Sequence, residues 1–221
     1  MIDVELHSHT HYSIDSLNRI ADIVRTCREV GIDRSAITDH NEIAGAVKAH
    51  ALAPDLVIVS EEVKTTQGEL LCLFINELIP RGVTPEEAIK RTHDQGGIVG
   101  APHPLDPIRS GLGRANLVRL APKLDFIEVF NARTLDLARN AEAEVLAREL
   151  GLPRSAGSDA HLLREIGGCR VRMRPYTSPQ DFLLALRDAE LITHFSSPLN
   201  HLGSRFAIIA HNLGLDKEHK D

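Results

Sequence analysis

The sequence predicts an α/β protein built on a parallel sheet or barrel. Short apolar runs, continuous rather than alternating, are separated by amphipathic stretches along the chain. Continuous apolar runs are typical of strands buried on both faces, and their alternation with helices favours parallel pairing. The length of 221 residues and the hydrophobic content of 43% fit one domain. Aromatic residues make up 4% and Trp is absent, so we expect a core of Leu, Ile, Val and Ala.

Seven strands are expected, each of them a short apolar run. They comprise residues 4–6, 35–38, 56–59, 70–75, 98–101, 125–130 and 154–156. Helices are expected at residues 16–30, 41–50, 84–95 and 134–150, with a late helix that opens at residue 178. We expect a single domain over residues 1–221, in which helices within 178–215 complete the fold.

Three features of these helices can be read from the sequence. Ser16 is a plausible N-cap of the first helix. Thr84 and Glu87 form a capping box around Pro85 at the first helical position. The 134–150 helix is expected to turn four residues inward, namely Ala138, Ala141, Val145 and Leu146.

Charge and composition exclude several classes of protein. The net charge of -6 disfavours non-specific binding of nucleic acid, which needs a basic surface, although short oligonucleotides stay possible. The sequence has no run of 18 apolar residues, so we expect no membrane span, and its N-terminus lacks the features of a signal peptide. The three cysteines, Cys27, Cys72 and Cys169, fit neither a disulfide framework nor a Cys-type zinc site. We expect buried thiols and a cytoplasmic location.

Imidazole and carboxylate side chains follow nearly every expected strand. The strand ends lead into His7, His9, Asp39, His40, Glu62, His103, Glu128, Asn131, Asp159 and His161. Active sites of α/β barrels lie at the carboxyl ends of the strands. Residues i and i+2 of a strand face the same side, so His7 and His9 project together. The same holds for Asp159 and His161 if the strand geometry extends that far.

This donor set predicts a metal centre. Imidazole with carboxylate suits Zn, Mn or Fe. One ion needs three or four protein ligands, so seven or eight candidates imply two or three ions that share bridging carboxylates. Such sites suit phosphoester hydrolysis, because they activate water and hold both the attacking and the leaving oxygen.

Four segments resemble the motifs of the PHP (polymerase and histidinol phosphatase) superfamily. His7-Ser8-His9-Thr10, followed by residues 12–16, resembles the first motif, and Thr38-Asp39-His40-Asn41 resembles the second. Ala101-Pro102-His103-Pro104 and Gly157-Ser158-Asp159-Ala160-His161 resemble later ones. The match spans residues 3–161 in the right order. The size of the chain and residues 61–65 resemble the stand-alone phosphoesterases, not the domain fused to DNA polymerases.

The resemblance implies a distorted (β/α)7 barrel with a trinuclear metal centre. His7, His9 and Asp159 would hold the first ion, with Glu62 bridging to a second ion that His103 serves. Asp15, His40 and His161 would hold the third ion. Many members place a His where this chain has Asn131, a weaker ligand without charge. The helix His of the family is matched by His93.

Several residues keep a second interpretation. Asp15 could cap the first helix, Asp39 is better explained as a cap or as a support for a ligand, and Glu61 competes with Glu62. His11 and His93 are better explained as structural than as ligands. His194 or His201 could reach the site from the last loops. Glu128 is a candidate for orienting a ligand.

The predicted function is hydrolysis of a phosphate ester, monoester or diester, of a small molecule by a metal-activated water. The candidates for proton transfer are Asp159, His161 and His40, and those for substrate binding are Arg109, Arg133 and Asn131. The cofactors would be two or three divalent ions of Mn, Zn or Fe. The alternatives are an amidohydrolase-like ester or amide hydrolase, and a non-catalytic metal-binding domain.

Overall fold

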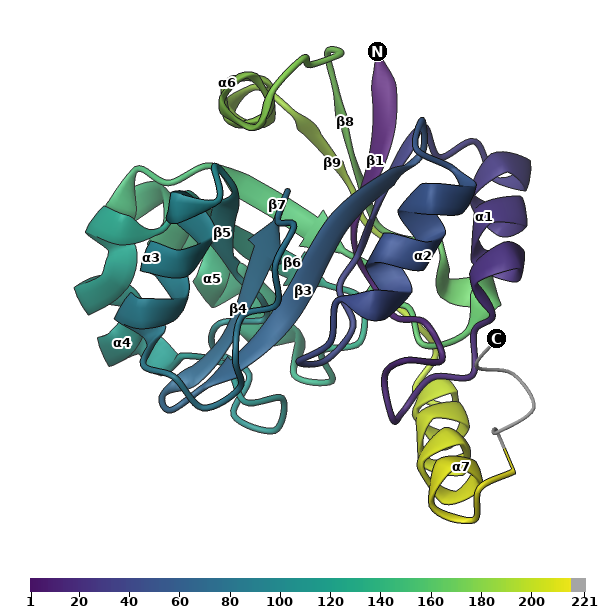
Figure 1. The fold of residues 1–221 in the computed structure, drawn as a ribbon. Coiled ribbons are helices and arrows are strands. Elements are labelled where there is room, and N and C mark those ends of the chain that lie inside the picture. The colour runs from purple at the N-terminus through teal and green to yellow at the C-terminus, as the bar shows by residue number, and fades with distance from the viewer. Residues whose placement is uncertain (216–221) are drawn as a thin grey trace.

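The computed structural model describes residues 1–215, which form a mixed α/β fold with helices packed around a strongly curved sheet (Figure 1). The described strands form one sheet in the order β7-β6-β5-β4-β3-β2-β1-β8-β9. Their bounds are β1 (Ile2–Ser8), β2 (Arg34–Ile37), β3 (Val57–Thr65), β4 (Gly68–Leu73), β5 (Ile98–Ala101), β6 (Phe126–Asn131), β7 (Arg154–Gly157), β8 (Arg170–Met173) and β9 (Glu190–Ile192). The helices are α1 (Ile20–Glu29), α2 (Ala44–Leu52), α3 (Pro85–Asp94), α4 (Gly113–Leu120), α5 (Leu137–Leu150), α6 (Pro179–Arg187) and α7 (Asn200–Asn212).

The sheet closes almost completely on itself. The carboxyl end of β1 pairs with the residues after β7, because the His9 amide donates to the Ala160 carbonyl at 2.9 Å and the Ala160 amide donates to the His7 carbonyl at 3.2 Å. The amino-terminal half of β1 pairs instead with β8, antiparallel. Strands β1 to β7 therefore form a nearly closed barrel from which β8 and β9 branch. The prediction of a distorted seven-stranded barrel is confirmed.

The prediction of parallel pairing throughout is wrong at β4. Strand β4 runs antiparallel to both β3 and β5, whereas β1-β2-β3 and β5-β6-β7 are parallel. The cause is the connection between β3 and β4, which consists only of residues 66 and 67. A parallel connection needs a crossover of a dozen residues or more, so two residues can only form a hairpin. The Thr65 hydroxyl tightens this hairpin by donating to the Gly68 carbonyl at 2.6 Å.

The first helix begins later than predicted. Helix α1 starts at Ile20, and Ser16 does not cap it. The Ser16 hydroxyl instead contacts the carbonyl oxygens of His9 at 3.1 Å and His161 at 3.3 Å. Residues 9–18 therefore form a loop that is tied to the carboxyl end of the barrel.

The predictions for the other helices are confirmed in part. The Thr84 cap of α3 is confirmed, since its hydroxyl accepts from the Glu87 amide at 3.2 Å, and α6 begins at Pro179 behind a Ser178 cap. The inward face expected for α5 is wrong except at Leu146. That helix starts at Leu137 and buries Asn140, Ala143, Leu146 and Ala147, while Val145 is exposed.

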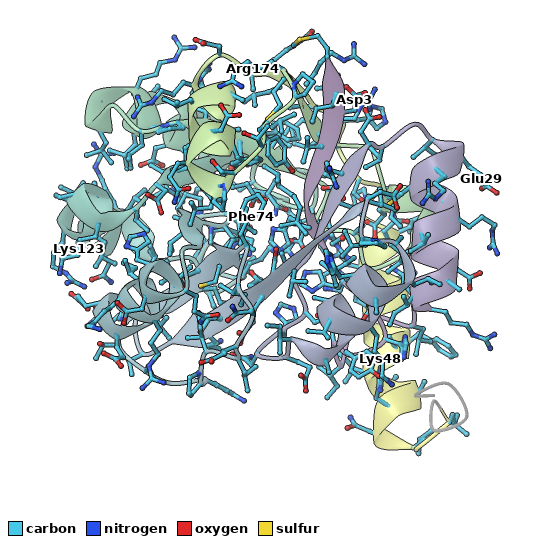
Figure 2. All side chains as sticks on the ribbon, turned by 45° about the horizontal axis from the view of Figure 1, so that its top comes forward. Asp3, Glu29, Lys48, Phe74, Lys123 and Arg174 are labelled. Atoms are coloured by element: carbon cyan, nitrogen blue, oxygen red, sulfur yellow. The ribbon has the colours of Figure 1, made fainter. Side chains whose placement is uncertain are left out.

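The core lies between the barrel and its helices and is made mainly of aliphatic side chains. Cys27, Cys72 and Cys169 are buried free thiols, as predicted, and burial raises the pKa of each one. Charged side chains such as Lys123 and Arg174 extend outward at the periphery (Figure 2). Among residues 1–215, no helix has both the length and the apolar character to cross a membrane.

Candidate metal centre

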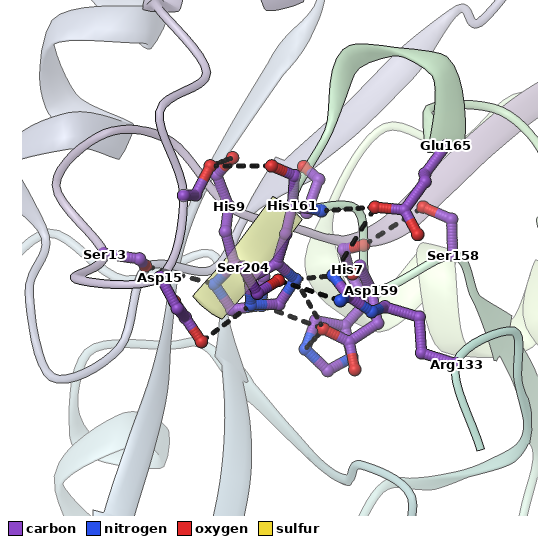
Figure 3. A network of polar contacts seen from close by, with 12 residues as sticks. His7, His9, Ser13, Asp15, Arg133, Ser158, Asp159, His161, Glu165 and Ser204 are labelled. Atoms are coloured by element: carbon purple, nitrogen blue, oxygen red, sulfur yellow. Dashed lines mark hydrogen bonds and ion pairs between the residues drawn. The ribbon is translucent and has the colours of Figure 1, made fainter. Parts of the chain in front are cut away.

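The carboxyl ends of the barrel strands bring the predicted ligands into one cluster. His7 and His9 come from the end of β1, His40 follows β2, and Glu62 lies on β3. The others follow β5 and β7 or come from the loop after β1: His103, Asp159, His161 and Asp15. Most of these side chains are almost inaccessible, and Figure 3 shows several of them converging on one point.

The innermost part of the cluster contains His7, His9, Glu62 and Asp159. The Nε2 atoms of His7 and His9 lie 3.6 and 3.2 Å from Oδ1 of Asp159. The same two nitrogens lie 3.4 and 3.6 Å from Oε2 of Glu62. Two carboxylates thus face two imidazole nitrogens around a common centre.

Glu62 also reaches the other histidines. Its Oε1 lies 3.1 Å from Nε2 of His103, and its Oε2 lies 2.9 Å from Nδ1 of His40. Glu61 points elsewhere, because its Oε2 accepts from the Ile79 amide at 3.0 Å. Of the two neighbouring glutamates, the structure therefore places Glu62 in the cluster.

Asp15 joins the outer side of the cluster. Its Oδ2 lies 3.0 Å from Nε2 of His161 and 3.5 Å from Nε2 of His40. It does not cap α1, whose capping position is Arg19. The two histidines and Asp15 form a group next to the inner one, with Glu62 between them.

The cluster leaves buried polar atoms without hydrogen-bond partners. They are Nε2 of His7, Nε2 of His9, Oε2 of Glu62, Oδ1 of Asp159, Nδ1 of His103 and Oδ1 of Asp15. Such atoms are costly to bury and demand an explanation such as an ion. Three groups have donor atoms close enough to share an ion: His7, His9 and Asp159; His7, Glu62 and His103; and His9, His40 and His161. Nitrogen and carboxylate oxygen are donors that suit Zn, Mn or Fe, so the residues fit metal ions.

Partner groups orient two of the inner imidazoles. Nδ1 of His7 lies 3.0 Å from Oε1 of Glu128, and Nδ1 of His9 lies 3.2 Å from the Ser13 hydroxyl. That hydroxyl donates to Asp39 at 2.8 Å. These contacts direct the Nε2 atoms toward the centre, as supporting carboxylates do in metal sites.

Asp39 supports the cluster from outside it. Its two oxygens accept from the amide and the hydroxyl of Thr10 and from Ser13. The sequence analysis missed the role of Ser13. Its position four residues after His9, within the first motif, was the available signal.

The electrostatics of the cluster are strongly perturbed. Burial opposes protonation of His7, yet the carboxylates of Asp159, Glu128 and Glu62 raise its pKa well above the ordinary value. Burial, together with the neighbouring His161 and His40, lowers the pKa of His9 to about 3. Burial favours the neutral form of Asp159, but Arg109 and His7 hold its pKa well below the usual range. These shifts favour the ionised form of Asp159 and the neutral form of His9, which are the forms that bind metal, whereas at His7 a metal ion must displace a proton.

The backbone is strained at two of these residues. His103 has φ of 28° and Asp159 has φ of 52°, both in the left-handed region that disfavours residues with a side chain. Strain of this kind persists where the surroundings fix it, and it gathers at functional sites.

The predicted substrate-binding residues differ in their surroundings. Arg109 forms an ion pair with Oδ2 of Asp159. Asn131 donates to Oε2 of Glu128 at 2.9 Å and to Oδ2 of Asp159 at 3.1 Å, so it links two carboxylates. Arg133 is buried and contacts Oε2 of Glu165 at 3.4 Å and the Ser204 hydroxyl at 2.8 Å.

Glu165, which the sequence analysis did not single out, joins several segments. Its Oε2 accepts from the amides of His161 at 3.1 Å and Leu162 at 3.0 Å, and contacts Arg133. Its Oε1 accepts from Asn200 of α7 at 3.2 Å. Figure 3 shows Glu165 and Arg133 beside His161. The carboxylate therefore connects α7 with the segment that carries His161.

Three of the other histidines within residues 1–215 lie outside this cluster, and a fourth, His201, lines the cavity beside it. Nδ1 of His11 lies 3.2 Å from the Asn18 carbonyl, and His93 pairs with Asp125 on the outer side of α3. His201 lines the cavity, whereas His194 is not among its lining residues.

A cavity of about 730 Å³ opens above the cluster. Asp15, His40, His103 and His161 form its floor, and residues of the 106–110 loop and of α7 form its walls. Its volume is in the range of small-molecule sites.

Two protein families match parts of this chain, and two proteins of one organism are similar to it. The PHP domain family matches residues 5–69, and the PHP-associated family matches residues 138–191. The uncharacterized protein MJ1587 of Methanocaldococcus jannaschii is 38% identical over 160 residues, which cover 66% of this chain and 92% of that protein. The uncharacterized protein MJ0417 of the same organism is 30% identical over 211 residues, covering 90% and 85%.

Solved structures share the fold at low identity. A two-domain protein of Bacteroides vulgatus, described as containing a predicted PHP-like metal-dependent phosphoesterase, aligns with a TM-score of 0.72 and 17% identity, covering 87% of this chain and 65% of that one. PsfC of Pseudomonas syringae aligns with a TM-score of 0.69 and 19% identity, covering 95% and 98%. The lesion-specific endonuclease PfuEndoQ of Pyrococcus furiosus aligns with a TM-score of 0.62 and 16% identity, covering 89% and 59%. The barrel, its cluster and these matches agree, and the chain belongs to the PHP family.

Proposed function

We propose that this protein is a metal-dependent phosphoesterase that hydrolyses a phosphate ester of a small molecule. The observation that carries the proposal is the set of buried nitrogen and carboxylate oxygen atoms that lack hydrogen-bond partners and face one another beneath the cavity. A buried arrangement of this kind is unfavourable without cations. Multi-ion centres suit phosphoester hydrolysis, because they stabilise both the attacking and the leaving oxygen.

The proposed ligand set uses the three groups of the cluster. His7, His9 and Asp159 would hold one ion, and Glu62 would bridge to a second ion at His103. Asp15, His40 and His161 would hold a third ion. The cofactors would thus be two or three divalent ions of Mn, Zn or Fe.

When bound, the ions would activate a water and neutralise charge on the phosphoryl oxygens. The protein supplies the rest. Glu128 holds the His7 imidazole in place directly, and Asp39 holds the His9 imidazole through the Ser13 hydroxyl. Asp159, His161 and His40 are our candidates for accepting and returning the proton.

The phosphate contact is assigned to Arg109. Its guanidinium lies at the cavity wall beside Asp159, so it adds a fixed positive charge next to the cluster. Arg133 also lines the cavity, but its side chain is only 2% exposed, against 17% for Arg109, and its guanidinium contacts Glu165 and Ser204. Asn131 serves mainly to separate and link Glu128 and Asp159.

The test combines metal analysis with a substrate panel. Protein purified without chelator should contain divalent metal and, with added Mn, hydrolyse members of a panel of phosphomonoesters and phosphodiesters. Activity should be lost in the double variant His7→Ala with His9→Ala and reduced in Arg109→Ala, but kept in the control Arg174→Ala, which lies on the outer surface. Protein without metal, or wild-type rates in the double variant, would refute the proposal.

The panel should also include carboxylic esters, amides and a short oligonucleotide. The first two examine the amidohydrolase alternative, and the oligonucleotide is included because PfuEndoQ is an endonuclease. The net charge of -6 favours the small substrates. Bound metal without turnover of any panel member would indicate a non-catalytic domain instead.

A further inference from the structure

Helix α7 carries apolar side chains on a face that the described residues leave uncovered. Of its residues Asn200–Asn212, only Asn200, Ala207 and Ala210 are buried. Five large apolar residues on and beside the helix have exposed fractions between 56% and 69%: Leu199, Leu202, Phe206, Ile209 and Leu213. Figure 1 shows the helix extending away from the barrel.

The spacing of these five residues is regular. They follow one another at intervals of three, four, three and four positions, which is the strict repeat of a seam between two helices. Scattered exposed apolar residues would need no explanation, but a continuous stripe does. We call these five residues the α7 stripe.

The rest of α7 is already engaged, so its orientation is fixed. Asn200 and Ser204 contact Glu165 and Arg133, and Nε2 of His211 lies 3.1 Å from the Ser16 carbonyl. A third side of the helix lines the cavity, through residues that include His201 and Arg205. Of the α7 stripe, Leu202 also lines the cavity, so the stripe borders the cavity wall, and its other four residues lie outside the cavity lining.

We propose that the α7 stripe is the interface between two copies of this chain, paired helix to helix about a two-fold axis. A two-fold interface uses the same patch on both copies, so the patch must complement itself. A stripe with the three-four repeat does so, because its side chains fit between those of an identical helix. Within residues 200–212 the only formal charge is Arg205, so little electrostatic repulsion opposes the pairing.

The available area is close to what a specific dimer needs. At ~180 Å² for each large apolar residue, the exposed fractions give roughly 550 Å² per copy. The stripe alone contributes at most roughly 1,100 Å² to a pair, so flanking residues must also be buried to reach the about 1,200 Å² at which specific interfaces begin. A helix as short as α7 is also marginal alone in water, so covering its apolar side stabilises it.

A membrane surface fits this helix less well. Helices that lie in the interface carry many Lys and Arg residues on the polar side, and α7 has only Arg205. The net charge of -6 also disfavours anionic lipid. Pairing of two copies would in addition hold the α7 wall of the cavity in place, because the same helix lines it.

The first experiment measures mass in solution. Sedimentation velocity of the full chain at micromolar concentrations should give twice the mass of one chain. The double variant Phe206→Asp with Ile209→Asp should raise the dimer dissociation constant at least ~10-fold, because it places charges in the seam. The matched control is Leu184→Asp on α6, an apolar residue that is 59% exposed, and it should leave the dimer intact. Monomeric wild-type protein, or a double variant as dimeric as the control, overturns the proposal.

A second experiment remains decisive if the charged variant unfolds α7. Phe206 is the middle residue of the stripe, so the two copies of it lie near the two-fold axis whether the helices pair parallel or antiparallel. Phe206→Cys should form an intermolecular disulfide under mild oxidation, and Leu184→Cys should not. The native cysteines are buried and give little background. Equal cross-linking of the two variants, or none in Phe206→Cys, contradicts the pairing, and binding to lipid vesicles by a monomer would point to a membrane surface instead.

Discussion

Single residues fix the direction of each candidate ligand. Glu128 is the clearest case, because its two oxygens contact Nδ1 of His7, the His103 amide and the Asn131 amide group. It binds three groups around the cluster without facing the centre itself. Glu128 thus positions candidate ligands that come from β1 and from the loop after β5.

Replacing Glu128 by Gln should weaken metal binding. The amide keeps the size of the side chain but loses the charge that orients His7, so we expect metal affinity to fall about 10- to 100-fold. Competition with a chromogenic chelator measures this. The control is Glu61→Gln, a buried glutamate next to Glu62 that faces away. Equal affinities of the two variants would contradict the assigned role.

Residue 157 must be a glycine because β7 runs close to the side chains of Glu128 and His7. A Cβ at this position would lie 2.1 Å from Oε1 of Glu128 and 2.7 Å from Cβ of His7. Gly157→Ala should therefore lower the free energy of unfolding by about 1–3 kcal/mol and also weaken metal binding. Urea unfolding and the chelator competition measure the two effects.

The control for Gly157 is Gly100→Ala. Its Cβ would lie 2.1 Å from the Phe126 ring, so the clash is with an apolar core residue and not with a residue of the cluster. That variant should lose stability but keep its metal affinity when folded. If Gly157→Ala also kept wild-type affinity, the contact with Glu128 would be only a matter of packing.

At the scale of elements, β3 separates two neighbouring glutamates by the alternation of a strand. Glu62 faces the cluster, whereas Glu61 is buried on the other side with only the Ile79 amide as partner for Oε2. Burial raises the pKa of Glu61 to about 8. The folded state therefore prefers the protonated form of Glu61.

This preference makes stability depend on pH in a known direction. The carboxyl has a pKa of 4.5 when unfolded and about 8 when folded, so the unfolded state gains relative stability as pH rises between these values. Glu61→Gln cannot ionise, and its amide oxygen can still accept from Ile79. In chelator, the advantage of Glu61→Gln over wild type should grow by on the order of 3 kcal/mol between pH 5.5 and 8. Urea unfolding at both pH values measures it, and an advantage that does not change with pH would disprove the assignment.

At the scale of the whole molecule, the barrel brings carboxylates from distant segments into one buried volume. Asp15, Glu62, Glu128 and Asp159 lie in or beside the cluster in a chain of net charge -6. Their mutual repulsion opposes folding unless cations offset it. Metal binding should therefore stabilise the fold as a whole.

Metal removal should lower the melting temperature. At 100 times the dissociation constant, an ion bound only by the folded state adds about 2.7 kcal/mol, which corresponds to roughly 5–10 °C for a chain of this size. Calorimetry with Mn and with chelator measures the shift. The double variant His7→Ala with His9→Ala should show no Mn-dependent shift, and a shift equal to that of the wild type would place the stabilising ion elsewhere.

The sequence by itself determined the fold class, most strand positions and the chemical identity of the cluster. Those features depend on local patterns: apolar runs, capping residues such as Thr84, and the two-residue spacing of His7 and His9, which a strand turns to one side. The choice of Glu62 over Glu61 followed from the same alternation.

Only the tertiary structure decided the rest, because the deciding contacts join residues far apart in the chain. The antiparallel pairing of β4 with β5 joins residues 71–73 to residues 98–100, the Ser16 hydroxyl contacts the His161 carbonyl, and Arg133 contacts Glu165 and Ser204. No local period encodes such pairings. The α7 stripe shows the same division. Its three-four repeat can be read from the sequence, but its exposure depends on which other side of α7 packs against the barrel.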